Sequence, residues 1–196
     1  MRLFVAVPIP PNTSRELGEV VAQMRVWPGM EGLRWSPPES WHITLQFLGS
    51  ATTRQYSCLV GRLCQIRADP VEIIPEEIGT FRRVGILYAG VKRISKLDDL
   101  ERLVTAATVP CGFIRQERPY QPHITLARQG SQSGRKGITV GAEKNGQFRT
   151  FQRFTCNEFA LYESLLGAPV RYEVREQFPL RMMPERQIPW SEPMEL

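Results

Sequence analysis

Apolar residues follow two different periodicities at the start of the chain. Residues 2–7 carry an apolar run that predicts a buried strand, and the prolines that follow end it. The next apolar residues have the spacing i, i+3, i+4 and i+7, which predicts an amphipathic helix. These residues are Leu17, Val20, Val21 and Met24. Thr13, with Glu16 three positions later, predicts a capping box at the start of this helix.

Both periodicities recur further along the chain. A second helix is expected from about residue 53 to residue 67, and a third has Leu97, Leu100, Leu103 and Val104 as its apolar stripe. Residues 71–78 are expected to be a β-rich segment, and strands are expected at residues 41–48, 85–91, 123–128, 148–163 and 170–178. The last two are expected to pair as a hairpin around a Gly-Ala-Pro turn at 167–169. Residues 129–147 are rich in Gly, Ser, Gln and Lys and predict a loop.

The two halves of the chain share one order of elements. Each runs through a strand, an amphipathic helix and a proline-bearing approach to the tetrapeptide HITL. Leu3 precedes His42 by 39 positions (42 − 3), and Ile86 precedes His123 by 37 (123 − 86). Matched spacing indicates a duplication and predicts an α+β fold of two lobes related by a pseudo-twofold axis. A doubly wound parallel sheet is the alternative. It is disfavoured because no Gly-rich phosphate turn follows the first strand of either half.

Composition and charge narrow the class of protein. The chain has 196 residues, of which 42% are hydrophobic, a formal charge of +5 and a pI near 9.3. This balance suits an anionic partner such as RNA, although many basic proteins bind none. No apolar stretch reaches the length of a membrane span, and the N-terminus lacks the pattern of a signal peptide. We therefore expect a cytoplasmic monomer without a membrane partner. The four cysteines show no zinc-ligand spacing and are expected to be free thiols.

Every histidine of the chain lies in a HITL tetrapeptide. In a strand, residues i and i+2 point to the same face, so His42 and Thr44 should project together, as should His123 and Thr125. The isoleucine and leucine of each motif should point into the core. Two such strands facing one cleft would place two imidazoles and two hydroxyls around one small volume.

This set of side chains suits phosphodiester chemistry. Imidazole has an unperturbed pKa of about 6.5, so one ring can take a proton from water while the other protonates a leaving oxygen. Threonine hydroxyls can donate to the non-bridging oxygens of a phosphate. One HxT alone is usually an ordinary strand feature, but two copies in a repeat favour a catalytic pair. A metal site is disfavoured because no third ligand lies nearby in the sequence, and we expect neither metal nor cofactor.

The motifs and their flanks resemble those of the 2H phosphoesterases, and within them the RNA 2′,3′-cyclic phosphodiesterases, also called 2′-5′ RNA ligase-like proteins. The matching segments are MRLFVAVPIP, LRWSPPESWHITLQFLG, RPYQPHITLAR, CNEFALYES and YEVREQFPL. They span residues 1–180 and leave a tail at 181–196. The resemblance implies antiparallel sheets with helices on their outer faces and a central groove. It also implies that His42 is the proton donor, His123 the proton acceptor, and a 2′-phosphate end of RNA the product.

Residues beside the motifs are candidates for substrate binding. Gln46 is in phase with His42 and is either a groove residue or merely exposed. Phe47 and Tyr120 could stack on a base or belong to the core. Arg128 suits phosphate, but strict alternation turns it away from His123 unless a twist or bulge intervenes. Other candidates, each with an equally simple structural reading, are Arg82, Arg83, Arg135, Lys136 and Tyr162.

Two other functions remain open from the residues alone. The first is 2′-5′ RNA ligation, which is the same chemistry run in reverse on a cyclic end and a 5′-hydroxyl. Hydrolysis is favoured over it because water is in excess and ligation requires two aligned ends. The second is a non-catalytic module that binds RNA ends or nucleotides. Two intact HxT motifs disfavour this module, because binding requires no acid–base pair.

Overall fold

The computed structural model describes residues 1–130, 151–165, 167 and 171–181. Most of the expected loop at 129–147, with Arg135 and Lys136, lies outside these ranges, as do two residues of the expected 167–169 turn and nearly all of the tail. The helices are α1 (Pro11–Met24), α2 (Thr53–Leu63) and α3 (Ser95–Thr108), with short 3₁₀ turns at Pro38–Ser40 and Val109–Cys111. The strands are β1 (Arg2–Pro8), β2 (Leu33–Trp35), β3 (His42–Ser50), β4 (Val71–Ile73), β5 (Pro75–Phe81), β6 (Ile86–Val91), β7 (His123–Gln129), β8 (Phe154–Cys156), β9 (Glu158–Leu165) and β10 (Arg171–Pro179).

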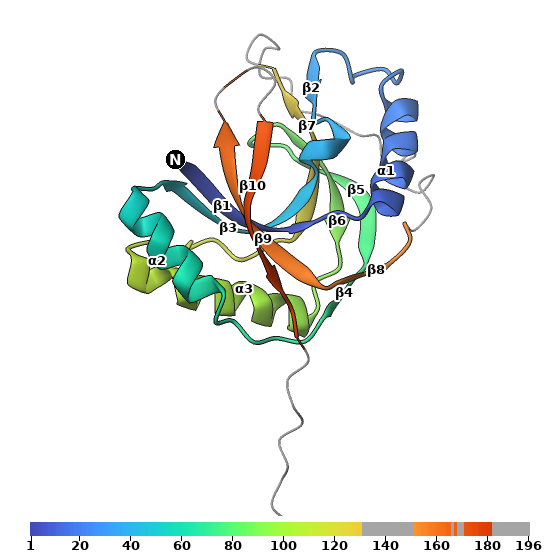
Figure 1. Cartoon of the computed structure of the whole chain (residues 1–196). Coiled ribbons are helices and arrows are strands. Elements are labelled where there is room, and N and C mark those ends of the chain that lie inside the picture. The colour runs from blue at the N-terminus through green and yellow to red at the C-terminus, as the bar shows by residue number, and fades with distance from the viewer. Residues whose placement is uncertain (131–150, 166, 168–170, 182–196) are drawn as a thin grey trace, which may run out of the picture.

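The expected pair of antiparallel lobes is confirmed. The main sheet has the order β10-β9-β1-β3-β7-β6-β5, with β2 added beside β7, and every pairing in it is antiparallel. The first lobe consists of β10, β9, β1 and β3, and the second consists of β5, β6, β7 and β2. The lobes join at one residue pair, Ile43 with Ile124, which is the isoleucine of each HITL motif. The two motifs therefore meet at the centre of the sheet (Figure 1).

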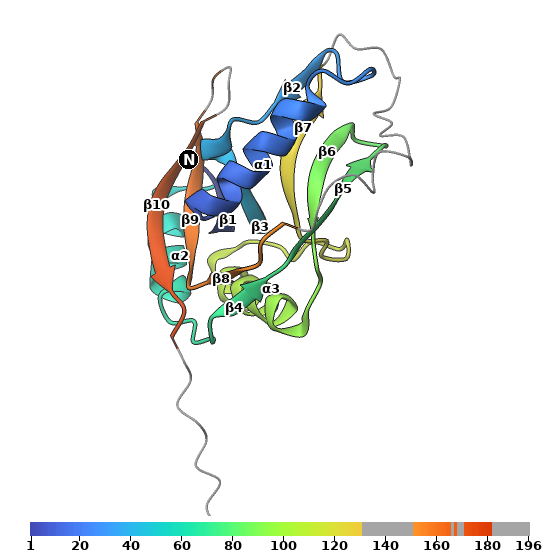
Figure 2. The same ribbon diagram turned by 90° about the vertical axis from the view of Figure 1, so that its right-hand side faces the viewer.

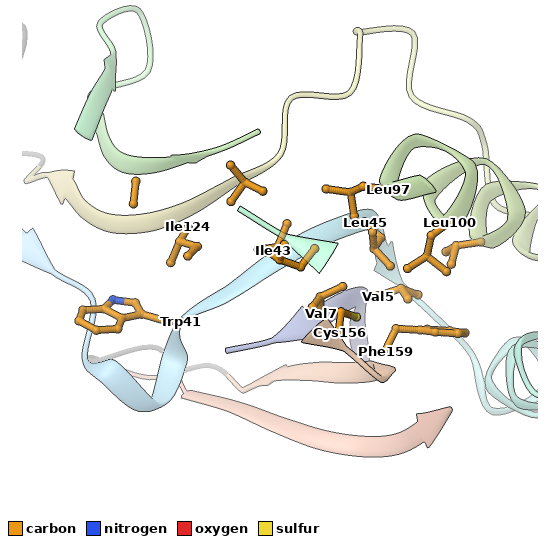
Figure 3. Packing of buried hydrophobic residues seen from close by; sticks show 14 of the residues in the cluster. Val5, Val7, Trp41, Ile43, Leu45, Leu97, Leu100, Ile124, Cys156 and Phe159 are labelled. Atoms are coloured by element: carbon orange, nitrogen blue, oxygen red, sulfur yellow. The ribbon is translucent and has the colours of Figure 1, made fainter. Parts of the chain in front are cut away.

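One apolar core fills the space between the sheet and the helices. The helices contribute most of the residues that their periodicity predicts, among them Leu17, Val21, Leu59, Leu63, Leu97 and Leu100. Leu103, which was expected in the stripe of α3, is instead 40% exposed. The sheet contributes Val5, Val7, Ile43, Leu45 and Ile124, which Figure 3 shows packed together with Leu97 and Leu100. Figures 1 and 2 show α2 and α3 side by side, away from α1. Because the helices pack on one face of the sheet, the opposite face carries the polar half of each motif.

Three local expectations were wrong. The capping box lies at α2, where Thr52 and Gln55 bond reciprocally, whereas α1 follows Pro10 with no side-chain cap. Thr13 is buried inside α1, so its hydroxyl is unavailable for capping. Helix α2 ends at Leu63, four residues before the expected end. The long strand expected at 148–163 is two strands, because β8 pairs with β4 in a separate sheet before β9 joins the main one.

The expectation of four free cysteines was also wrong. Cys58 of α2 forms a disulfide with Cys111, which lies just after α3, with 5.7 Å between their Cα atoms. Cys64 and Cys156 are free. The two bonded residues are 53 positions apart, so sequence spacing alone did not indicate that they meet. The disulfide links α2 to the end of α3, on the core side of the sheet.

Candidate active site

Both histidines begin a central strand and lie on one face of the sheet. His42 and Thr44 alternate with the buried Ile43 and Leu45 in β3, and the same alternation holds for the second motif in β7. The motif isoleucines face the core, so the four polar side chains lie on the other face, which we call the histidine face. Each histidine and each threonine there is half-buried. The structure therefore brings together the four residues that the sequence singled out.

Each imidazole is held by a backbone carbonyl two residues earlier in the chain. Nδ1 of His42 lies 2.7 Å from the oxygen of Ser40, and Nδ1 of His123 lies 2.7 Å from the oxygen of Gln121. A carbonyl oxygen only accepts, so Nδ1 carries the hydrogen and donates it. In the neutral ring, Nε2 is then the unprotonated nitrogen. Both rings therefore keep Nε2 available to exchange a proton with a substrate.

Burial disfavours the charged form of both rings. It lowers the pKa of His42 to about 4, with smaller lowering contributions from the charges of Arg128 and His123 and an opposing one from the bond to Ser40. The pKa of His123 is also lowered, first by burial and then by the charge of Arg128, against the bond to Gln121. The two rings and one guanidinium therefore lie within electrostatic reach of one another. Such a cluster attracts an anion.

The same bulge occurs in both motifs and changes which residues face the site. Opposite β1, Thr44 and Gln46 pair with successive residues, so Leu45 is the extra residue; opposite β6, Leu126 is the extra residue in the same way. Two neighbouring side chains are consequently buried in each strand, and the phase reverses after them. The bulges turn Phe47 and Arg128 toward the histidine face.

Gln46 is therefore not a groove residue. The bulge at Leu45 turns it into the core, where it is 2% exposed. Its Oε1 accepts a hydrogen bond of 2.8 Å from the hydroxyl of Thr108, which is fully buried in α3. Phe47 takes the place that strict alternation gave to Gln46, and it is 55% exposed.

Aromatic rings enclose His42 on the first lobe. Phe4 of β1 and Tyr172 of β10 lie 4.7 Å and 5.1 Å from its ring centroid, and Tyr162 of β9 lies 5.9 Å away. Phe4 and Tyr162 are stacked and belong to a small second apolar cluster on the histidine face. Tyr162 is thus part of the wall of the site, and burial raises its pKa to about 12, so its hydroxyl stays protonated. The ring centroid of Phe47 lies 6.2 Å from that of Phe4, so Phe47 extends this wall.

A smaller aromatic pair flanks His123 on the second lobe. Phe81 and Tyr88 stack at 4.1 Å and contact the edge of the imidazole at 5.0 Å and 5.5 Å. Gly79 makes this pair possible, because a Cβ at that position would lie 2.6 Å from the Tyr88 ring. The aromatic surroundings explain why burial, more than any charge, governs the pKa of both histidines.

Tyr120 lies on the core side and not beside the histidines. It packs against the main core cluster, and its buried hydroxyl has no hydrogen-bond partner within the described residues. Burial, followed by the charges of Glu101 and Asp98, raises its pKa above the ordinary value. This packing favours the core interpretation of Tyr120 over base stacking.

Of the aromatic residues that enclose the histidines, sequence reasoning named Tyr162 and Phe47 and missed the others. Phe4 lies in β1, which is apolar on both faces, so its run of apolar residues hides the alternation. Tyr172 and Phe81 come from strands far from the motifs in sequence. Tyr88 was detectable, because it alternates with the buried Leu87 and Ala89 in β6. Pairing β6 with the second motif would have placed it opposite Thr125.

Within the described ranges, no group of three or more His, Cys, Asp or Glu side chains is arranged to hold a metal ion. The described helices likewise include none with the length and apolar character needed to cross a membrane.

The chain matches a known family over most of its length. The family model of LigT-like phosphoesterases matches residues 7–88 and 95–172. The chain is 34% identical over 183 residues to a Bacillus subtilis protein named RNA 2′,3′-cyclic phosphodiesterase, covering 90% of this chain and 95% of that one. A protein of the same name from Archaeoglobus fulgidus is 29% identical over 169 residues, covering 85% of this chain and 92% of its own length.

Solved structures share the fold. A structure of Escherichia coli LigT complexed with 3′-AMP has a TM-score of 0.76 at 22% identity, covering 92% of this chain and 98% of that one. The TT0787 protein of Thermus thermophilus has a TM-score of 0.69 at 26% identity over the same shares. With its duplicated motifs, its two antiparallel lobes and a family match over most of its length, the chain belongs to the LigT-like phosphoesterases of the 2H superfamily.

Proposed function

We propose that this protein hydrolyses the 2′,3′-cyclic phosphate ends of RNA to 2′-phosphomonoesters. One observation carries the proposal. Two imidazoles lie on one face of the sheet, each with Nδ1 bonded to a carbonyl and Nε2 left for proton transfer. The curated relatives named RNA 2′,3′-cyclic phosphodiesterase support the choice of substrate.

The reaction assigns one proton transfer to each ring. Nε2 of His123 takes a proton from water as the water oxygen forms its bond to phosphorus. The bond from phosphorus to the 3′ oxygen breaks, and Nε2 of His42 gives that oxygen a proton. The hydroxyls of Thr44 and Thr125 donate to the non-bridging oxygens, and Arg128 offsets their negative charge. The phosphate leaves as a 2′-monoester, with one histidine holding the proton that the other has lost.

The wall around His42 favours this assignment. In an in-line displacement, the leaving 3′ oxygen and its nucleoside lie on the side of the acid, and water lies on the opposite side. Phe47 and the other rings beside His42 provide a surface on which a base can stack. The nucleoside is therefore expected on the first lobe, with His42 next to the oxygen that leaves.

An activity assay tests the proposal directly. Purified protein should convert 2′,3′-cyclic AMP to 2′-AMP, identified by its chromatographic separation from 3′-AMP, and EDTA should leave the rate unchanged. Loss of activity in EDTA and its return with a divalent ion would contradict the metal-independent mechanism. Binding of the cyclic nucleotide without turnover would identify a binding module. Joining of a cyclic end to a 5′-hydroxyl, faster than hydrolysis, would identify a ligase.

The two limbs of the pH profile of kcat/KM should lie at unusually low pH. In the free enzyme both histidine pKa values are lowered, that of His42 to about 4, so the limbs of kcat/KM should both fall below the ordinary histidine pKa of about 6.5. The bound phosphate anion favours protonated His42, so the alkaline limb of kcat should lie at higher pH than that of kcat/KM. Rates from pH 4 to 9 would check this.

The variant Arg128→Gln tests the direction of the shift in the histidine pKa values. The charge of Arg128 lowers the pKa of both histidines, so its removal should move both limbs of kcat/KM to higher pH. An alkaline limb of the wild-type kcat/KM at or above pH 7 would show that the rings are less buried than the structure indicates.

A further inference from the structure

Arg34 lies directly across from Arg128 on the neighbouring strand. The short strand β2 pairs with the end of β7, with Leu33 opposite Gln129, Arg34 opposite Arg128 and Trp35 opposite Ala127. Directly opposed residues of an antiparallel pair project from the same face, with Cβ atoms about 5 Å apart. Arg34 therefore lies next to Arg128. Figure 1 shows the two strands that carry them, β2 and β7, side by side.

The neighbours of Arg34 show which face this is. Leu33 and Trp35 pack against the main core, and the guanidinium of Arg25, from α1, lies 5.5 Å from the centre of the Trp35 ring. Both flanking side chains thus point to the helix-covered face. By alternation Arg34 points the other way, to the histidine face, where the bulge has also placed Arg128.

Two opposed cations without a counter-charge favour the binding of an anion. Both arginines are exposed, and neither forms an ion pair with a carboxylate in the part of the chain that the structure describes. Like charges directly opposite one another destabilise a strand pair. The adjoining turn from β5 to β6 adds the exposed Arg82 and Arg83 to this end of the sheet. A phosphate between guanidiniums would remove the repulsion, because arginine binds phosphate in a bidentate manner.

The two arginines are not equivalent with respect to the histidines. The charge of Arg128 lowers the pKa of both imidazoles, whereas Arg34, on β2 at the edge of β7 that β6 does not occupy, is not among the charges that shift either pKa. Arg128 is thus placed to meet the reacting phosphate. An RNA end brings a second anion, the phosphodiester one nucleotide upstream.

We propose that Arg34 is a specificity-determining residue that binds the phosphodiester one nucleotide upstream of the cyclic end, so that the site prefers an oligonucleotide to a mononucleotide. This inference rests on the proposed function, since it names a longer substrate for the same site. The RNA strand would then leave the site past β7 and β2. A cyclic mononucleotide has no such phosphodiester and gains nothing from Arg34.

Paired substrates test the role of Arg34. The measured quantity is kcat/KM for the cyclic-ended dinucleotide ApA divided by kcat/KM for 2′,3′-cyclic AMP. In Arg34→Gln this ratio should fall about 10-fold, the order expected for loss of one charge-assisted hydrogen bond. The fall should come from a higher KM for the dinucleotide. Arg34→Lys should recover part of the ratio. The control is Arg62→Gln, which removes the same charge from α2 on the helix-covered side and should keep the wild-type ratio. The affinity for the dinucleotide should also depend less steeply on salt concentration in Arg34→Gln than in the wild type, because one ion pair that salt screens has been removed.

A binding measurement separates this inference from the proposed function. ApA ending in a 2′-phosphate is the expected product, and calorimetry should show about 10-fold weaker binding to Arg34→Gln than to wild type. This readout needs no turnover, so it judges Arg34 even if the protein hydrolyses neither substrate. Equal losses on mononucleotide and dinucleotide would place Arg34 at the reacting phosphate and overturn the proposal. Unchanged product binding would overturn it as well.

Discussion

Replacing either histidine by alanine is expected to lower kcat by about 10²–10⁴-fold, the range typical of one general acid or base. The physical reason is the geometry of the rings. Nδ1 is committed to a backbone carbonyl in both, so Nε2 is the nitrogen that can move a proton, and the nearby hydroxyl of Tyr162 has its pKa raised by burial. Loss of both histidines should cost much less than the product of the single losses, because the pair acts as a unit. Single-turnover rates of the three variants would measure this.

Asparagine at the same positions gives a matched control. Its side-chain amide can replace Nδ1–H as the donor to Ser40 or Gln121, but it has no counterpart of Nε2. His42→Asn and His123→Asn should therefore be as inactive as the alanine variants and closer to wild type in stability. An asparagine variant that retained activity would show that the carbonyl contact, and not proton transfer, is what catalysis requires.

A better leaving group distinguishes the two roles. If the 3′ oxygen is replaced by a group that leaves without a proton, the acid becomes unnecessary while the base is still required. Such a substrate should rescue His42→Ala far more than His123→Ala. Equal rescue of both variants would contradict the assignment of His42 as donor and leave the two-histidine site in place.

Within the two motif strands, the sequence predicted the centre of the site and failed beyond the bulges. Alternation correctly placed each motif histidine and threonine on one face, because the strands are regular over those residues. It failed one residue later, where the bulges at Leu45 and Leu126 reverse the phase. For that reason Gln46 points into the core and Phe47 points to the histidine face, the reverse of strict alternation. Arg128 likewise points to the histidine face, although strict alternation would turn it away. A bulge is set by the pairing with a neighbouring strand, which a single-strand pattern does not contain.

Long-range contacts account for the other differences. The Cys58–Cys111 disulfide and the ring of Tyr172 beside His42 depend on how distant elements pack, and no local pattern encodes that packing. Strand β2 has only three residues and lies inside a proline-rich approach, so its periodicity was too short to detect. Arg34 was overlooked for that reason. Apart from the exposed Leu103, the apolar stripes of the three helices were predicted well, because burial on one face repeats several times along each helix.

Thr44→Val and Thr125→Val are each expected to lower kcat by about 10²–10³-fold, the range for removing one donor from a site that stabilises charge on oxygen. Valine keeps the shape and the β-branch of threonine, so the half-buried position on the strand should tolerate it. Neither hydroxyl has a hydrogen bond to another described group, which leaves both free to donate to the non-bridging oxygens.

Serine variants at the same positions distinguish hydrogen-bond donation by the threonine hydroxyl from packing by its methyl group. Thr44→Ser and Thr125→Ser keep the hydroxyl and lose only a methyl group, so most of the rate should return, with KM close to that of the valine variants. Because charge on the non-bridging oxygens grows in the transition state, the valine loss should fall on kcat more than on KM. Serine variants as slow as the valine variants would show that the methyl groups position the histidines. The threonines would then act through packing, and charge at phosphorus would be met by Arg128 alone.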